Sequence, residues 1–275
     1  MKIDKKNLAF LLLTGIVMIT AIWGPEKLAG YKDKYILNQP RVQTVENAGE
    51  GYRYALSRRE RLYILAESLD SQILPESEHN ALTRNEISDV EYDISGTYAF
   101  VVNHKGPTGK EITGEEIFDV CNQELLKFKE LGILPEEVKA VEAQLYDAVL
   151  YSAIDVLEPR NNVAVWKLSL SNNHKRAGKE NRLIDIYIDA DDGKVYEFYA
   201  RTSQSWENIN TDEIITKWAE YMGLPAYEPL ETENPLAETT PYFQKYVFGG
   251  KDEERTVVTI GFYEGINEVF LKISK

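Results

Sequence analysis

The chain is poor in the residues that build disulfide frameworks and metal sites. It contains one cysteine, Cys121, three histidines and three methionines among 275 residues. A single cysteine excludes an intrachain disulfide and any zinc site built from several thiolates. Cys121 falls on the apolar side of a helical pattern, so we interpret it as a core residue, with a reactive thiol as the alternative.

Basic residues are also scarce. Lysine and arginine number 31 against 45 aspartates and glutamates, and the formal net charge is -14. Residues 1–23 have a local charge of +2, which leaves about -16 for the remainder. Phosphate backbones and anionic lipid repel such an acidic body, so we predict no nucleic-acid partner and no basic helix lying on a membrane. Cationic partners and cell-wall cations are compatible with it.

The motifs of common enzymes are missing. The histidines, His79, His104 and His174, are dispersed and lie in no HExxH pattern, and there is no GxSxG elbow. A glycosidase pair of carboxylates has no signal of its own, because 45 acidic residues always include some pair at a suitable separation. We therefore predict no catalytic residue, no cofactor and no metal site, and we interpret the acidic residues as a solvated surface.

Two segments resemble ligand loops in composition alone. Residues 106–110, GPTGK, have glycines too close together for a phosphate loop, and Glu111 stands where a magnesium-binding Ser or Thr belongs. Residues 189–193, DADDG, have the glycine one position early for a calcium loop and lack the distal glutamate in register. We interpret both as turns.

One long apolar run is present near the start. Leu8 to Trp23 carries no charge, and lysines precede it. This arrangement predicts a retained transmembrane signal anchor at residues 1–24, with a cytoplasmic N-terminus and an extracytoplasmic C-terminal domain on a bacterial-type cell membrane. A cleaved signal peptide is the main alternative, although ITAIWG lacks small residues at a cleavage site, and a buried soluble helix is the other.

The remainder alternates helices and strands. Residues 25–50 read as a juxtamembrane spacer. Helices are predicted from Tyr52 to Ile73, from the Thr113 and Glu116 capping box to Gly132, and from Thr211 to Met222. Alternating aromatic and β-branched residues predict strands near residues 97–103, 144–156, 163–170, 183–189, 194–202, 242–248, 256–263 and 267–273, with a long loop at 228–241.

This order, a helix followed by antiparallel strands, occurs twice. We predict an α+β fold consisting of an N-terminal transmembrane helix and two helix-plus-antiparallel-sheet units, a first unit at 51–205 and a smaller one at 206–275. Residues 182–200, RLIDIYIDADDGKVYEFYA, contain a hairpin with an Asp192-Gly193 turn. This hairpin resembles that of PepSY-type, cystatin-like extracytoplasmic domains. The layout of anchor and outer domain is similar to that of the YycH and YycI regulators of sensor kinases.

The resemblance implies a regulatory or inhibitory function. We predict a membrane-anchored, non-enzymatic accessory protein that acts by contact with an envelope or membrane protein. A surface for such a partner is predicted at Tyr196, Phe198, Tyr199 and Trp206, because aromatic side chains are enriched at interfaces. The alternative is an envelope hydrolase or ligand-binding protein whose site is assembled from loops.

Overall fold

The computed structural model describes Thr14 and residues 53–71, 97–171, 180–224, 227–231, 238–250 and 254–275. The chain divides into two compact units, Met1–Ala48 and Gly49–Lys275, and the fold described below is that of the second. His79, His174 and most of the predicted anchor and spacer lie outside the described residues.

Three helices lie within the described part of the second unit: α2 (Arg58–Asp70), α4 (Ile117–Glu130) and α5 (Thr211–Met222). The predicted first helix begins later than expected because Ser57 and Glu60 form a reciprocal capping box there. The predicted box of Thr113 and Glu116 is also present at the start of α4, and Asn210 caps α5. Helices α2 and α5 therefore begin where a side chain accepts a free backbone N–H, whereas the box of Thr113 and Glu116 closes the turn just before α4.

The strands confirm most of the predicted segments. Their bounds are β1 (Tyr98–Val102), β2 (Tyr146–Asp155), β3 (Asn162–Leu170), β4 (Leu183–Asp189), β5 (Val195–Arg201), β6 (Tyr227–Leu230), β7 (Tyr242–Gly249), β8 (Arg255–Tyr263) and β9 (Glu268–Ser274). Short 3-10 turns occupy Trp206–Asn208 and Glu264–Ile266. Strand β6 lies partly within the segment predicted as a loop.

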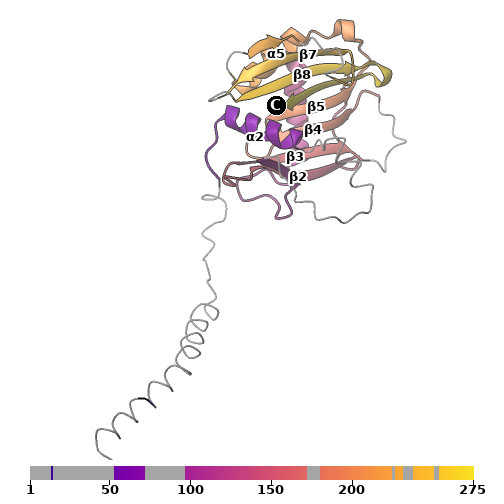
Figure 1. Cartoon of the computed structure of the whole chain (residues 1–275). Helices are drawn as coiled ribbons and strands as arrows, with labels where there is room; N and C mark the ends of the chain where they lie inside the picture. Colours follow the sequence, from indigo (N-terminus) through magenta and orange to yellow (C-terminus); the bar gives the residue numbers. More distant parts are fainter. Residues whose placement is uncertain are drawn as a thin grey trace, which may run out of the picture. The chain divides into compact units, whose positions relative to one another are not determined.

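The nine strands of the described residues form one antiparallel sheet in the order β1-β2-β3-β4-β5-β9-β8-β7-β6 (Figure 1). The first five strands follow chain order, and the last four return in reverse order, so β9 pairs with β5. The predicted fold class is wrong on this point, because the two helix-plus-sheet units share a single sheet. Pairing of β5 with β9 joins segments about 70 residues apart, which no local pattern reveals.

The transmembrane part of the predicted fold class is also corrected. Within the ranges that the structure describes, no helix is both long enough and apolar enough to cross a membrane. The assignment as a membrane-spanning protein therefore has no support in the described fold, which is mostly sheet.

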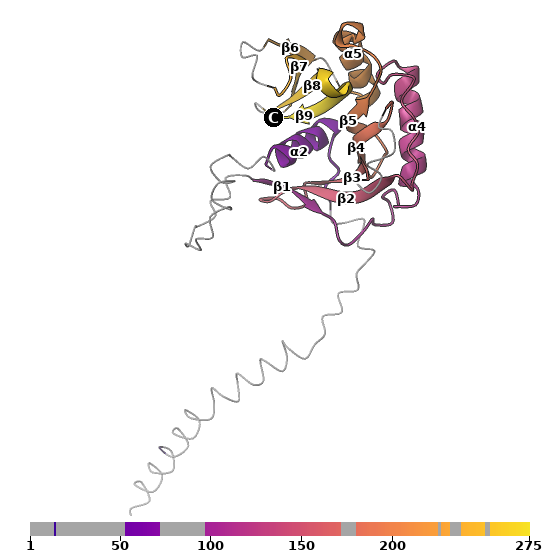
Figure 2. The ribbon, with the colours of Figure 1, turned by 90° about the vertical axis from the view of Figure 1, so that its right-hand side faces the viewer.

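The helices cover opposite faces of the sheet. Helix α2 lies on one face, toward which the sheet curls, and α4 and α5 lie on the other (Figure 2). The two outer helices meet where the rings of Phe128 and Tyr221 pack edge to face at 4.9 Å, and Trp218 of α5 packs on Phe248 of β7. Cys121 is fully buried in α4, and burial raises the pKa of its thiol, as expected of a core residue.

Candidate partner-binding surface

The four aromatic residues predicted as a partner surface occupy different environments. Tyr196 and Phe198 are buried, and Phe198 packs against Phe128 of α4 at 5.9 Å between ring centroids. Tyr199 and Trp206 are partly exposed, with Tyr199 stacked on Phe270 at 5.7 Å. A partner can reach the latter two residues alone, and their use as an interface stays a prediction.

A second group of apolar side chains is more exposed. It lies on the turn between β2 and β3 and on the segment before α2. Leu157 is 77% exposed, Tyr54 48% and Val156 45%. With the exposed Pro159 and Arg160, these residues form what we call the turn surface: Tyr54, Val156, Leu157, Pro159 and Arg160.

The turn that carries Leu157 is held by its own hydrogen bonds. The Asp155 carboxylate accepts the backbone N–H of Leu157 at 2.9 Å and that of Glu158 at 3.2 Å. The N–H of Asn161 donates to the carbonyl of Glu158 at 2.8 Å, and the N–H of Asp155 donates to the carbonyl of Asn161 at 3.0 Å. This Asp-initiated turn fixes the backbone that carries the exposed leucine.

Tyr54 is attached to the same turn. Its backbone N–H donates to the carbonyl of Arg160 at 3.1 Å, and the Arg160 guanidinium lies 5.7 Å from the centre of the Tyr54 ring. Asn162 Nδ2 donates to the carbonyl of Pro159 at 3.0 Å on the other side. Cation–π contact and backbone pairing together place the aromatic ring beside the turn.

The segment that carries Tyr54 is fixed by an arginine–carboxylate cluster. Its cations are Arg53, Arg58 and Arg61, and its anions are Glu111, Asp189, Asp191 and Asp192. Arg61 binds Asp189 at 2.5 Å and also pairs with Asp191, while Arg53 pairs with Glu111. Burial opposes ionisation of Asp192, but its hydrogen bond from Arg58 lowers the pKa of this carboxyl.

This cluster explains the DADDG turn that resembled a calcium loop. Its carboxylates face arginines, and no group of three or more potential ligands among the described residues is arranged for a metal ion. Gly193 adopts a φ of 77°, which is the left-handed conformation that the predicted hairpin turn requires. The hairpin that carried the resemblance therefore anchors α2 to the sheet.

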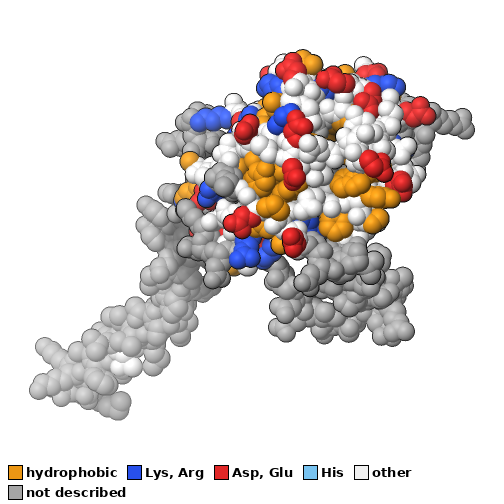
Figure 3. All heavy atoms as spheres, turned by 90° about the horizontal axis from the view of Figure 1, so that it is seen from above, with side chains coloured by type: hydrophobic (Ala, Val, Ile, Leu, Met, Phe, Trp, Pro, Cys, Tyr) orange, Lys and Arg blue, Asp and Glu red, His pale blue; other side chains and the backbone are white. Residues whose placement is uncertain are grey.

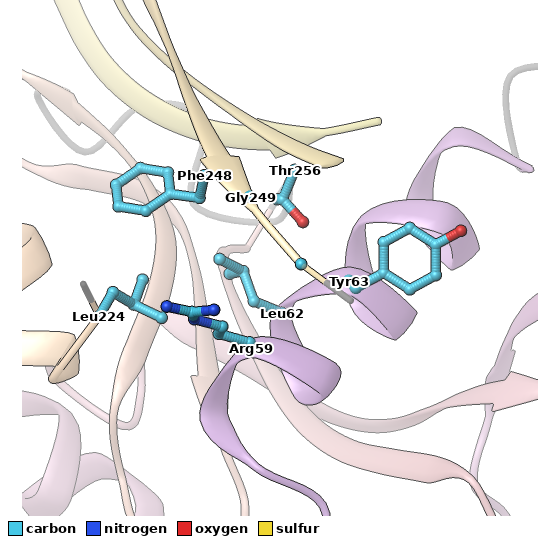
Figure 4. A pocket seen from close by; sticks show the side chains of 8 residues that line it. Arg59, Leu62, Tyr63, Leu224, Phe248, Gly249 and Thr256 are labelled. Carbon is cyan, nitrogen blue, oxygen red and sulfur yellow. The ribbon is translucent and has the colours of Figure 1, made fainter. Parts of the chain in front are cut away.

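A shallow hollow lies between α2 and the ends of β7 and β8 (Figure 4). Arg59, Leu62 and Tyr63 of α2 line one side, and the other is lined by Leu224, Phe248, Gly249, Gly250 and Thr256. Its volume is about 10 Å³, which is space for roughly one water molecule. Its lining contains no carboxylate, and its ionisable side chains are those of Arg59 and Tyr63.

The carboxyl group of Glu197 has a raised pKa, but it lies away from this hollow. Burial raises the pKa of Glu197 to about 7, although the hydrogen bond from Ile273 N–H opposes this shift. Glu197 is buried in the middle of the sheet and does not line the hollow. Its position gives a substrate no access to the carboxyl group.

Acidic side chains are scattered among apolar ones on the face shown in Figure 3. No protein-family model, curated protein or solved structure matches the chain. The resemblance to PepSY-type domains and to YycH and YycI regulators stays a prediction.

The sequence contains a weak signal for the turn surface, namely apolar residues within a turn. Residues 156–160, VLEPR, place two apolar side chains inside a turn that contains Pro159. Turns are ordinarily polar, so apolar residues at such a position indicate either burial under another segment or contact with a partner.

Proposed function

We propose that the chain is a non-enzymatic accessory or regulatory protein that acts by protein–protein contact through the turn surface. The observation that carries this proposal is the 77% exposure of Leu157 on a turn whose backbone is fixed by hydrogen bonds. An exposed leucine alone is ordinary. A leucine on a hydrogen-bonded turn that also carries the exposed Val156, and to which the segment of Tyr54 is bonded, is a feature that binding surfaces use.

The composition of the turn surface supports protein contact. Tyrosine and arginine are enriched among residues that dominate binding energies, and Tyr54 and Arg160 provide one of each. A fixed backbone reduces the conformational entropy that is lost on binding. Both properties favour a folded protein partner that has an apolar depression.

The nature of the partner follows from the predicted location. We propose an envelope or membrane protein as the partner, acting outside the cytoplasm. The lysines followed by the uncharged run from Leu8 to Trp23 support this location, because a segment of this kind can direct export as a signal peptide. The hollow described above does not favour the alternative function, an envelope hydrolase or ligand-binding protein, because it is small and has no carboxylate lining.

The experiment places a photo-crosslinking amino acid at Leu157 of the full-length chain in cells. The matched control carries the same group at Leu126, which is 58% exposed on α4. We expect a discrete heterologous protein crosslinked from position 157 and absent from position 126, and we expect Arg160→Glu to reduce its yield. Equal yields from both positions, or none from 157, would contradict the proposal.

A further inference from the structure

A pair of aromatic rings lies where the connection between β5 and α5 meets the start of β7. Trp206 opens the short 3-10 turn of that connection, and Tyr242 is the first residue of β7. Their ring centres are 6.2 Å apart and their planes are inclined at 45°. Both side chains are partly exposed, so a partner can reach the pair.

Hydrogen bonds fix the segments that carry the two rings. The N–H of Thr202 donates to the carbonyl of Asn267 at 2.9 Å, which joins the segment before Trp206 to the turn between β8 and β9. The N–H of Tyr242 donates to Oγ1 of Thr240 at 3.2 Å. The pair is therefore largely arranged before a partner arrives, and less conformational entropy is lost on binding.

Two exposed carboxylates flank the rings. Glu207 follows Trp206 in the chain, and Oε2 of Glu264 accepts the hydroxyl of Tyr242 at 3.2 Å. A hydrogen bond from Ser205 lowers the pKa of the Glu207 carboxyl, which is therefore ionised at neutral pH. The charge of Glu264, and to a smaller extent that of Glu207, raises the pKa of the Tyr242 hydroxyl. Both negative charges thus act on the space beside the same ring.

The described residues provide no cation at this place. Elsewhere in the chain a lysine lies over an aromatic ring, as Lys194 does over Tyr221 at 3.9 Å. No such contact involves Trp206 or Tyr242 within the described ranges. The ion pairs of these ranges also leave out both carboxylates. Indole is the aromatic ring that attracts cations most strongly, so the surface is complementary to a positive group.

We propose that Trp206, Glu207, Tyr242 and Glu264, which we call the aromatic-acidic surface, bind an arginine side chain of a partner protein. A guanidinium group stacks on an aromatic ring and at the same time donates N–H groups to carboxylates. The net charge of -14 favours the approach of a basic segment. This inference is independent of the proposed function, because no residue of the turn surface takes part in it.

Nuclear magnetic resonance of the full-length chain tests the surface. The probe is an acetylated and amidated peptide of alternating arginine and glycine. We expect the indole N–H signal of Trp206 to shift until it saturates, whereas that of Trp218, which is buried under α5, stays in place. The same peptide with lysine in place of arginine should bind at least about threefold more weakly, because an ammonium group does not stack on the ring.

Variants separate the surface from general attraction to an acidic protein. Trp206→Leu should weaken peptide binding about fivefold, as followed by the amide signal of Glu264, because the cation–π contact is lost. Glu264→Gln should weaken it about threefold. Glu115→Gln is the matched control, because it removes the same charge at an exposed glutamate before α4, and it should leave the affinity unchanged.

Three results would overturn the inference. One is a Trp206 indole signal that does not respond to the arginine peptide. Another is unaltered affinity in Trp206→Leu, and the third is an equal loss in Glu264→Gln and Glu115→Gln, which would indicate general charge attraction. If Trp206→Leu does not fold, equal affinities of the arginine and lysine peptides for the unaltered protein would refute stacking. None of these results bears on crosslinking from Leu157, so the proposed function is tested separately.

Discussion

The guanidinium group of Arg61 binds the buried carboxylate of Asp189 at 2.5 Å, and this contact joins α2 to the turn of the β4–β5 hairpin. The hydroxyl of Tyr196 donates to the same carboxylate at 2.5 Å. Asp189 has no exposed surface, and its carboxylate is also bound by Arg58 and by the backbone N–H of Asp191. A helix that precedes the sheet in the sequence is thus attached to the β4–β5 hairpin by an ion pair whose carboxylate is buried.

Asp189→Asn is expected to destabilise the protein by about 2–3 kcal/mol, because removing one partner of a buried ion pair leaves the other charge without compensation. Asp192→Asn is the matched control. Its side chain is 38% exposed, so the loss should stay below about 1 kcal/mol. Urea unfolding of both variants measures the difference, and equal losses would show that burial of Asp189 has no special effect.

The elements of the fold could be predicted because their signals are local. The capping box of Thr113 and Glu116 and the Asp192-Gly193 turn each involve residues a few positions apart. Pairing of β5 with β9 has no such signal. The apolar and polar residues of β5 and β9 alternate in a way that also suits a strand at the edge of a sheet. Whether the chain forms one sheet or two therefore depends on contacts between distant segments.

The candidate site was harder to predict than the fold. Alternation along β5 placed Tyr196 and Phe198 on one face and Tyr199 on the other, but the sequence does not say that helices cover both faces. Leu157 was missed for a different reason. A single apolar residue in a turn resembles many harmless exposed leucines, and its significance comes from the fixed backbone, which depends on the Asp155 carboxylate.

Gly261→Ala is expected to destabilise the sheet by about 2 kcal/mol. A methyl group at this position would lie 2.3 Å from Cζ of Phe270, its partner across β8 and β9. The Phe270 ring has little room to move, because it stacks on Tyr263 at 4.8 Å and on Tyr199 at 5.7 Å.

A double-mutant cycle tests the origin of this cost. In a Phe270→Ala background, Gly261→Ala should change the free energy of unfolding by less than about 0.5 kcal/mol, because the obstructing ring is gone. Gly249→Ala is the control, since no atom lies within 4 Å of the added methyl group. An unchanged cost in the Phe270→Ala background would assign the effect to the backbone instead.

Leu157→Asp and Asp155→Ala should separate binding from folding. The side chain of Leu157 is exposed, so its replacement should change stability by less than about 0.5 kcal/mol while reducing partner capture from a crosslinker at Val156. Asp155→Ala removes the acceptor of two backbone N–H groups and should cost about 1 kcal/mol. Thermal unfolding and crosslinking yield are measured together. Loss of stability in Leu157→Asp would indicate a structural role for this leucine.

Glu197→Gln should stabilise the protein at high pH and change its stability little at low pH. The pKa of Glu197 is about 7 in the folded chain and near 4.5 when unfolded, so the folded state binds more protons between these values. Stability contributed by the protonated carboxyl is fully present below about pH 4.5 and is lost as the pH rises through 7.

At pH 8 the variant is expected to be more stable than the unaltered protein by roughly 2–3 kcal/mol, because the glutamine is never ionised inside the sheet. Urea unfolding at pH 5, 6, 7 and 8 measures this difference, and other titrating groups cancel because both proteins contain them. A difference that stays constant with pH would mean that Glu197 titrates equally in the folded and unfolded chains. A difference of the opposite sign would mean that its ionised form is compensated where β5 meets β9, with Lys272 or Lys167 as its partner.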